Sequence, residues 1–159
     1  MSEISAYHEA GHAFMATYVG ARVRSVTIDP DDDDGPERFA DTQVEWPLSD
    51  FSQRELSENS ILVALAGPVA EMIYRGEPYH PGFVAEWAAD WREAWQHAAF
   101  VSDSDKKRLA YLERTTVRLY QLLDQEDHWA ALASIADHLL AHETLETEEV
   151  EAIVRQWMN

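Results

Sequence analysis

His8-Glu9-Ala10-Gly11-His12 is the stretch from which the fold and the chemistry of this 159-residue chain can be worked out. It lies inside a segment, Glu3 to Tyr18, whose apolar periodicity predicts a helix. Residues four apart lie on one helix face, so His8 and His12 are expected to point into the same space, with Glu9 beside them. An H-E-x-x-H pattern on a helix is typical of zinc hydrolases, in which both imidazoles bind the metal and the glutamate is the general base.

The motif alone does not establish a metal site, because it should arise by chance in on the order of a few per cent of such chains. A catalytic zinc also needs a third protein ligand, and the chain has no cysteine, so His, Asp or Glu must supply it. The candidates on later predicted helices are Glu71, Glu86, Asp90, Glu93 and His97. Their spacing in the sequence does not indicate which of them is the third ligand. Asp90 and Glu71 rank together, because both carboxylates have apolar neighbours in sequence, among which an unpaired charge is costly.

Composition narrows the class of protein. With 46% hydrophobic residues the chain can build one core, so we expect a single domain over residues 1–159. A formal net charge of -18 disfavours nucleic acid and anionic membranes as partners. The sequence has neither a secretory signal pattern nor a run of about 18 apolar residues, so we expect a cytoplasmic protein. The acidic run Asp31 to Asp34 predicts a solvated loop; a cation site and a loop that filters substrates by charge are the alternatives.

The predicted elements are mostly helical. Alternation over Arg22 to Ile28 and an extended piece over Thr42 to Trp46 predict a small antiparallel sheet. Ser52 and Glu55 form a capping box that begins a long helix, for which Gly76 lies beyond the end. Further helices are predicted over residues 84–100, 104–123, 127–141 and 148–158. The predicted fold class is therefore mainly α (α+β).

Four segments carry a resemblance to a known family: residues 6–13 (AYHEAGHA), 23–30 (VRSVTIDP), 65–76 (LAGPVAEMIYRG), and Ala89-Asp90-Trp91 with Ala94 and Ala98. In this order they resemble the peptidase domain of the FtsH family of AAA-type membrane zinc proteases. Residues 117–154 are similar to that family's closing helical bundle. The resemblance implies a helical zincin-like domain with a small antiparallel sheet and a C-terminal helical bundle.

Carried over to this sequence, the resemblance implies a set of site residues. His8, His12 and Asp90 would bind one Zn²⁺ per chain, and Glu9 would be the general base. Glu71 would be a supporting residue near the site. We also expect Gly11, which has no side chain, to leave room beside the metal.

We expect the strand that follows the motif to hold substrate. By analogy with other zincins, Val23, Val26 and Ile28 would pair with an extended peptide through an exposed strand edge. The chain departs from the family at Ala66, Ala89 and Trp95, which stand for a glycine, an asparagine and a threonine. The sequence begins at the motif helix, so the ATPase module and membrane anchors of the family are expected to be absent.

The predicted function is ATP-independent hydrolysis of peptide bonds in peptides or unfolded chains by a zinc metalloendopeptidase. The alternative is a non-enzymatic zinc-binding adaptor or regulatory domain derived from the same fold, and hydrolysis of a small amide would use the same chemistry. A homo-oligomer is possible, although the negative charge opposes close packing of copies. Trp87, Trp91 and Trp95 recur every four residues and form a stripe that is most often core, with an oligomer contact or a pocket wall as alternatives.

Overall fold

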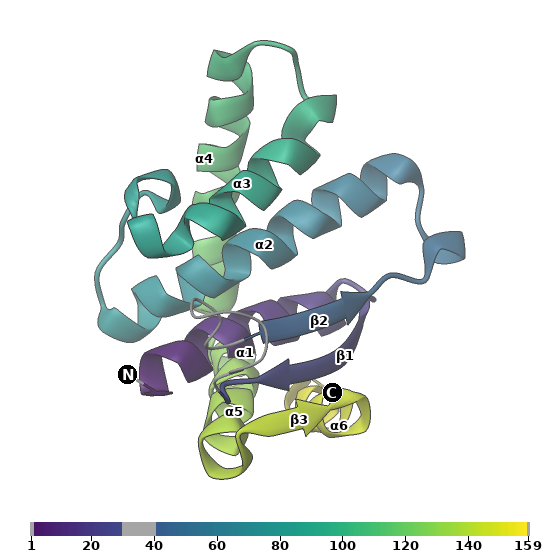
Figure 1. Ribbon diagram of the computed structural model, residues 1–159, viewed down its shortest axis with the longest axis vertical. Helices are drawn as coiled ribbons and strands as arrows, with labels where there is room; N and C mark the ends of the chain where they lie inside the picture. The colour runs from purple at the N-terminus through teal and green to yellow at the C-terminus, as the bar shows by residue number, and fades with distance from the viewer. Residues whose placement is uncertain (1, 30–40, 159) are drawn as a thin grey trace.

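The computed structural model describes residues 2–29 and 41–158, so the acidic run Asp31 to Asp34 lies outside the described residues. Within that part of the chain, a small sheet packs against α1, with α2 above it in the view of Figure 1. The helices are α1 (Ser2–Tyr18), α2 (Gln53–Arg75), α3 (Ala88–His97), α4 (Asp105–Leu123), α5 (Glu126–His142) and α6 (Thr147–Met158). The strands are β1 (Arg22–Thr27), β2 (Asp41–Glu45) and β3 (Thr144–Glu146). The prediction of a mainly α (α+β) fold with a small antiparallel sheet is confirmed.

Helix α1 lies at the centre of the fold and contacts α2, α5, α6, β1 and β2. Small residues on its buried faces let these neighbours approach, with Ala6, Ala10 and Ala13 fully buried. Phe14 and Met15 then supply bulk to the core. The helix that carries the motif is therefore held on several sides, which fixes the direction of its remaining side chains.

Helix α2 has both of the end signals expected from the sequence. The Ser52 side chain accepts from the backbone N–H of Glu55, whose carboxylate accepts from the backbone N–H of Ser52, and Gly76 ends the helix with φ 74°. Among the described helices, α2 is the one whose length and composition would allow it to cross a bilayer, which the sequence analysis did not expect. However, 67% of that apolar window is buried inside the fold, as in a core helix.

The sheet corrects one prediction about the substrate strand. The strand order is β2-β1-β3, with β1 antiparallel to both neighbours. Val23 and Val26 are buried on the central strand, and the backbone N–H of Ile28 donates to the carbonyl of Glu143. The expectation of an exposed edge at Val23, Val26 and Ile28 was therefore wrong. The cause is β3, a three-residue strand between α5 and α6 that pairs with Ser25–Thr27 on the second edge of β1. Three residues show too little alternation to be predicted as a strand.

The region around α3 is less regular than predicted. Instead of one helix over residues 84–100, α3 spans ten residues and is flanked by short 3₁₀ turns, including Ala85–Trp87 before it and Ala98–Phe100 after it. Helix α3 contacts α2 and α4, and its N-terminal turn carries Asp90. Packing of α3 on α2 is what brings a residue from the middle of the chain to the motif helix.

Candidate metal centre

The two imidazoles of the motif point to the same place, as the helical spacing predicts. The Nε2 atoms of His8 and His12 lie 3.1 Å apart, and the rings meet edge to face at 77°. His12 is buried and His8 is partly buried, with 14% of its side chain exposed. Both nitrogens are presented at the floor of a cleft.

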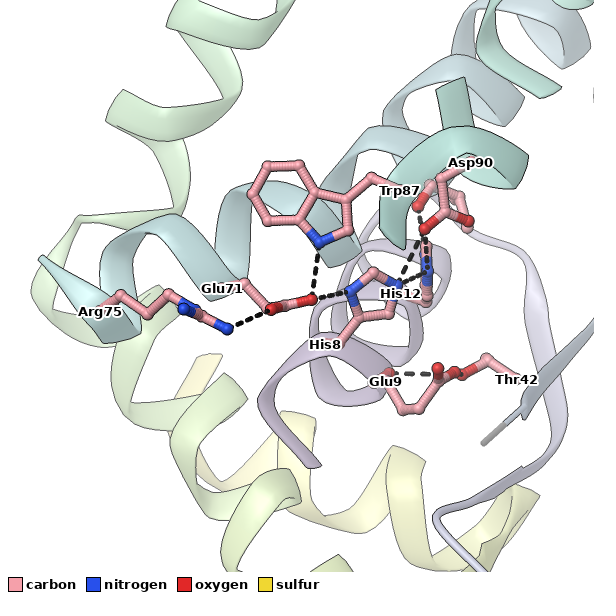
Figure 2. Close-up of polar contacts among 9 residues, drawn as sticks. His8, Glu9, His12, Thr42, Glu71, Arg75, Trp87 and Asp90 are labelled. Atoms are coloured by element: carbon pink, nitrogen blue, oxygen red, sulfur yellow. Dashed lines mark hydrogen bonds and ion pairs between the residues drawn. The ribbon is translucent and has the colours of Figure 1, made fainter. Parts of the chain in front are cut away.

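Asp90 completes this group. Its Oδ2 lies 2.8 Å from Nε2 of His8 and 3.4 Å from Nε2 of His12 (Figure 2). These three atoms form the one group of at least three such side chains, among the described residues, that could hold a metal ion. Glu86, Glu93 and His97, the other candidates from α3 and its approach, line the cleft without joining the group.

The far side of each imidazole is fixed by a hydrogen bond. Nδ1 of His8 donates to Oε2 of Glu71 at 2.6 Å, and Nδ1 of His12 donates to the carbonyl of Val63 at 2.7 Å. Such contacts set the tautomer and the ring orientation of a metal-binding histidine and leave Nε2 for the metal. Glu71 does not join the three-atom group, and its place is behind His8.

Glu71 is itself held by two further contacts. Its Oε2 also accepts from Nε1 of Trp87 at 2.8 Å, and Arg75 lies one turn further along α2, 3.7 Å from Oε1. Trp87 is buried, so its indole N–H needs this partner. Because Trp87 lies three residues before Asp90, its bond to Glu71 also ties the start of α3 to the histidine pair.

The charges in the group perturb one another strongly. Burial opposes a charge on His8, but hydrogen bonds to Asp90 and Glu71 outweigh it and raise the pKa of His8 from 6.5 to about 10. The pKa of His12 is also raised, because the negative charge of Asp90 outweighs burial. Burial would raise the pKa of Asp90, yet the attraction of His12 and the hydrogen bonds from both histidines hold it well below its ordinary 3.8. The negative charge of Asp90 therefore acts on both imidazoles.

Glu9 lines the same cleft from the adjacent position on α1. It is a buried acid, 7% exposed, and its Oε1 accepts a hydrogen bond of 2.6 Å from the hydroxyl of Thr42 on β2. Thr42 was not predicted as a site residue, and no local pattern marks it, because its contact with Glu9 depends on where β2 lies relative to α1. Figure 2 shows Glu9 and Thr42 facing one another below the histidine pair.

Two glycines permit close packing, in different ways. A side chain at Gly11 would collide with the carbonyl of Ala66 and lie 2.8 Å from the Cβ of Ala70, both on α2. A side chain at Gly67 would instead lie 2.8 Å from Nε2 of His8 and closer still to Nε2 of His12. The expectation that Gly11 leaves room beside the metal was therefore wrong, because position 11 faces the α2 backbone. Gly67 is the glycine that leaves space beside the two Nε2 atoms.

The cleft has a volume of about 780 Å³ and runs between β2 on one side and α2 and α3 on the other. Five of its described lining residues are acidic and none is lysine or arginine; the acids are Glu9, Asp41, Glu86, Asp90 and Glu93. Trp87, Trp91 and Trp95 do not line it. Trp87 belongs to the core, and the other two are partly buried and pack against the core, so the core interpretation of the stripe fits their packing.

Comparison with known proteins adds no assignment. No family model matches this chain, and no curated protein matches it significantly in sequence. The geometry of the cleft is therefore the feature of this chain that points to a function.

Proposed function

We propose that this protein is a zinc-dependent metallopeptidase that hydrolyses peptide bonds in peptides or unfolded chains. The observation that carries the proposal is the convergence of His8, His12 and Asp90 at the floor of an open cleft. Glu9, an acid suited to act as general base, lines the same cleft. A structural ion pair would have no need of the cleft or of the glutamate.

The donor set fits zinc in chemistry and in spacing. Two imidazole nitrogens and one carboxylate oxygen are borderline ligands of the kind found in catalytic zinc sites, which keep a fourth position open. Ligands about 2.0–2.1 Å from a tetrahedral ion are about 3.3 Å apart. The three observed separations of 2.8, 3.1 and 3.4 Å are close to that value, so small side-chain movements would accommodate the ion.

The residues of the chain then have distinct tasks. Bound zinc supplies Lewis acidity, which lowers the pKa of water to about 7 and polarises a carbonyl. Glu9 accepts the proton of the attacking water and transfers it to the leaving amine. Glu71 and the Val63 carbonyl keep the His8 and His12 rings aligned, as hydrogen-bonded partners behind a metal site do.

Strand β2 is the proposed substrate-binding strand, through its outer edge. Among the described residues β2 pairs with β1 alone, and its other edge is the side on which a peptide could be added. Thr42, Val44 and Trp46, on or beside this strand, line the cleft. An extended peptide added to this edge would lie across the floor, where its recognition would depend mainly on backbone hydrogen bonds. Such a site takes extended chains and excludes folded ones.

We also propose that this is the fold of the FtsH-family peptidase domain. Its support is the resemblance of four ordered segments, together with the position of Asp90, the residue that the resemblance selected as third ligand. Independent sequence evidence for the relationship would come from intermediate homologues.

The test is metal analysis of the purified protein together with cleavage of an unstructured protein such as casein, with no ATP added. Wild type is compared with Glu9→Gln, which keeps the size of the side chain and removes the base. Stoichiometric zinc and turnover that Glu9→Gln abolishes would support the peptidase. Zinc without turnover would refute it and favour a zinc-binding adaptor.

A further inference from the structure

We propose that Thr42 is a positioning residue for Glu9, so that the strand that receives the substrate also orients the general base. This inference rests on the proposed function. Its basis is one contact between distant parts of the chain: the hydroxyl of Thr42 donates to Oε1 of Glu9 at 2.6 Å. The two residues are 33 positions apart and belong to β2 and α1.

The position of Thr42 is fixed independently of this contact. On β2 it is paired with Val26, which is fully buried at the centre of the sheet. Its hydroxyl also lies 3.4 Å from the main-chain carbonyl of Glu9. Thr42 is therefore anchored by the β ladder, and its β-branched side chain has few rotamers available, so it holds the hydroxyl in one direction.

A fixed donor gives the two carboxylate oxygens of Glu9 different tasks. Oε1 is occupied by the Thr42 hydroxyl, and among the described residues no hydrogen bond to Oε2 is found. Oε2 is then the oxygen free to accept a proton from water. Without the donor the carboxylate can rotate, and a misplacement of about 1 Å in a catalytic group can cost about a hundredfold in rate.

The contact also links substrate binding to catalysis. A peptide added to the edge of β2 that faces away from β1 would form its hydrogen bonds on the strand that holds the Thr42 side chain. Movement of that strand on binding would move the donor and the carboxylate together. Substrate binding and the orientation of Glu9 would thus both depend on β2. This link follows from the contact between β2 and α1, and the H-E-x-x-H motif by itself does not provide it.

The test compares Thr42→Val, which keeps the shape and removes the hydroxyl, with Thr42→Ser, which keeps the hydroxyl. For Thr42→Val we expect kcat to fall by about ten- to a hundredfold with KM changed by less than about threefold. Thr42→Ser should recover most of kcat. The matched control is Thr115→Val in α4, which removes another buried hydroxyl, bonded to the carbonyl of Tyr111, and should leave kcat unchanged.

A thermal double-mutant cycle on the metal-free protein gives a readout that needs no activity. If Thr42 acts through Glu9, the effects of Thr42→Val and Glu9→Gln on melting temperature should be non-additive, as expected for residues in contact. The same should hold for the zinc-loaded protein: when Glu9 is already replaced by Gln, Thr42→Val should not lower the melting temperature further.

Two outcomes would overturn the inference while leaving the proposed function intact. The first is an active wild type whose kcat is unaffected by Thr42→Val. The second is that the losses of melting temperature from Thr42→Val and Glu9→Gln are additive in both the metal-free and the zinc-loaded protein. An inactive wild-type protein that binds zinc would overturn the proposed function and, with it, the role of Thr42 in catalysis. The thermal cycle would still report whether the contact exists, so the two failures can be told apart.

Discussion

Gly67→Ala should separate metal binding from fold stability. Gly67 is buried within α2, and an added Cβ would lie 2.8 Å from Nε2 of His8 and 2.7 Å from Cε1 of His12. Ordinary contact begins at 3.4 Å, so the His8 nitrogen would have to move by about 0.6 Å, the difference between 3.4 and 2.8 Å. Metal–ligand distances tolerate deviations of only about 0.2 Å. One added methyl group therefore displaces both imidazoles from a common metal.

The effect on stability is smaller, because two contributions oppose one another. Alanine is preferred over glycine in a helix interior by about 1 kcal/mol. Overpacking a well-filled site costs about 1–3 kcal/mol. The metal-free variant should then be less stable by about 0–2 kcal/mol, which for a chain of this size lowers the melting temperature by up to about 8 °C. Zinc affinity should fall by at least about a hundredfold, more than expected for loss of an outer hydrogen-bond partner.

The assay is competition for zinc with a chromophoric chelator, paired with thermal unfolding of the chelator-treated protein. Gly11→Ala is the matched control: its Cβ would collide with the α2 backbone and with Ala70, not with the histidine nitrogens. Gly11→Ala should destabilise the fold. For the same loss of stability, it should reduce zinc affinity less than Gly67→Ala does. Wild-type zinc affinity in folded Gly67→Ala would refute the reasoning that places both Nε2 atoms against this glycine.

Three further predictions concern the charges of the site. Glu71→Gln should weaken zinc binding by about 10- to 100-fold while the fold is retained, as chelator competition would reveal; unchanged affinity would mean that its bond to His8 does not support the metal. In the metal-free protein the pKa of His8 is raised from 6.5 to about 10, so its contribution to stability is complete below pH 6.5 and is lost as pH rises through about 10. The lowered pKa of Asp90 has the opposite sign, with a contribution present above about pH 3.8 and lost in more acid solution. Melting temperatures should fall below about pH 3.8 and above about pH 6.5, and a His8→Asn variant should show a smaller alkaline fall, the remainder coming from His12, whose pKa is also raised. Finally, lysine- and arginine-containing peptides should be cleaved in preference to acidic ones at low salt, and neutralising Glu86 and Glu93 should reduce that preference more than the same charge change on α6. Equal effects at both places would assign the preference to net charge alone.

Local sequence patterns predicted the elements well where the physics is local. The capping box at Ser52 and Glu55, the left-handed glycine at position 76 and the extent of α1 all follow from interactions within a few residues. Strand β3 was missed, because three residues between two helices have too little alternation to be recognised. They become a strand only because β1 lies beside them and offers its backbone groups.

The site residues also fall into two groups, those that the sequence alone predicts and those that only the tertiary structure reveals. The convergence of His8 and His12, with Glu9 beside them, depends on the turn of one helix, so the sequence alone predicts it. Resemblance to a family selected Asp90, but its distance from the histidines depends on α3 packing against α2. No local pattern assigns Thr42, Val63, Trp87 or Gly67 to the site, although Gly67 lies in a segment that carries the resemblance and Trp87 in the tryptophan stripe.

What the sequence determined by itself is the motif helix, the absence of thiolate ligands, the acidic character and the mainly helical fold. These properties are set by composition and by contacts between near neighbours along the chain. Tertiary structure alone decided which strand is central in the sheet, which glycine faces the imidazoles and which residues hold Glu9 and His8 in place. Those relations join residues tens of positions apart, and such distances are fixed only when the helices and the sheet pack into one core.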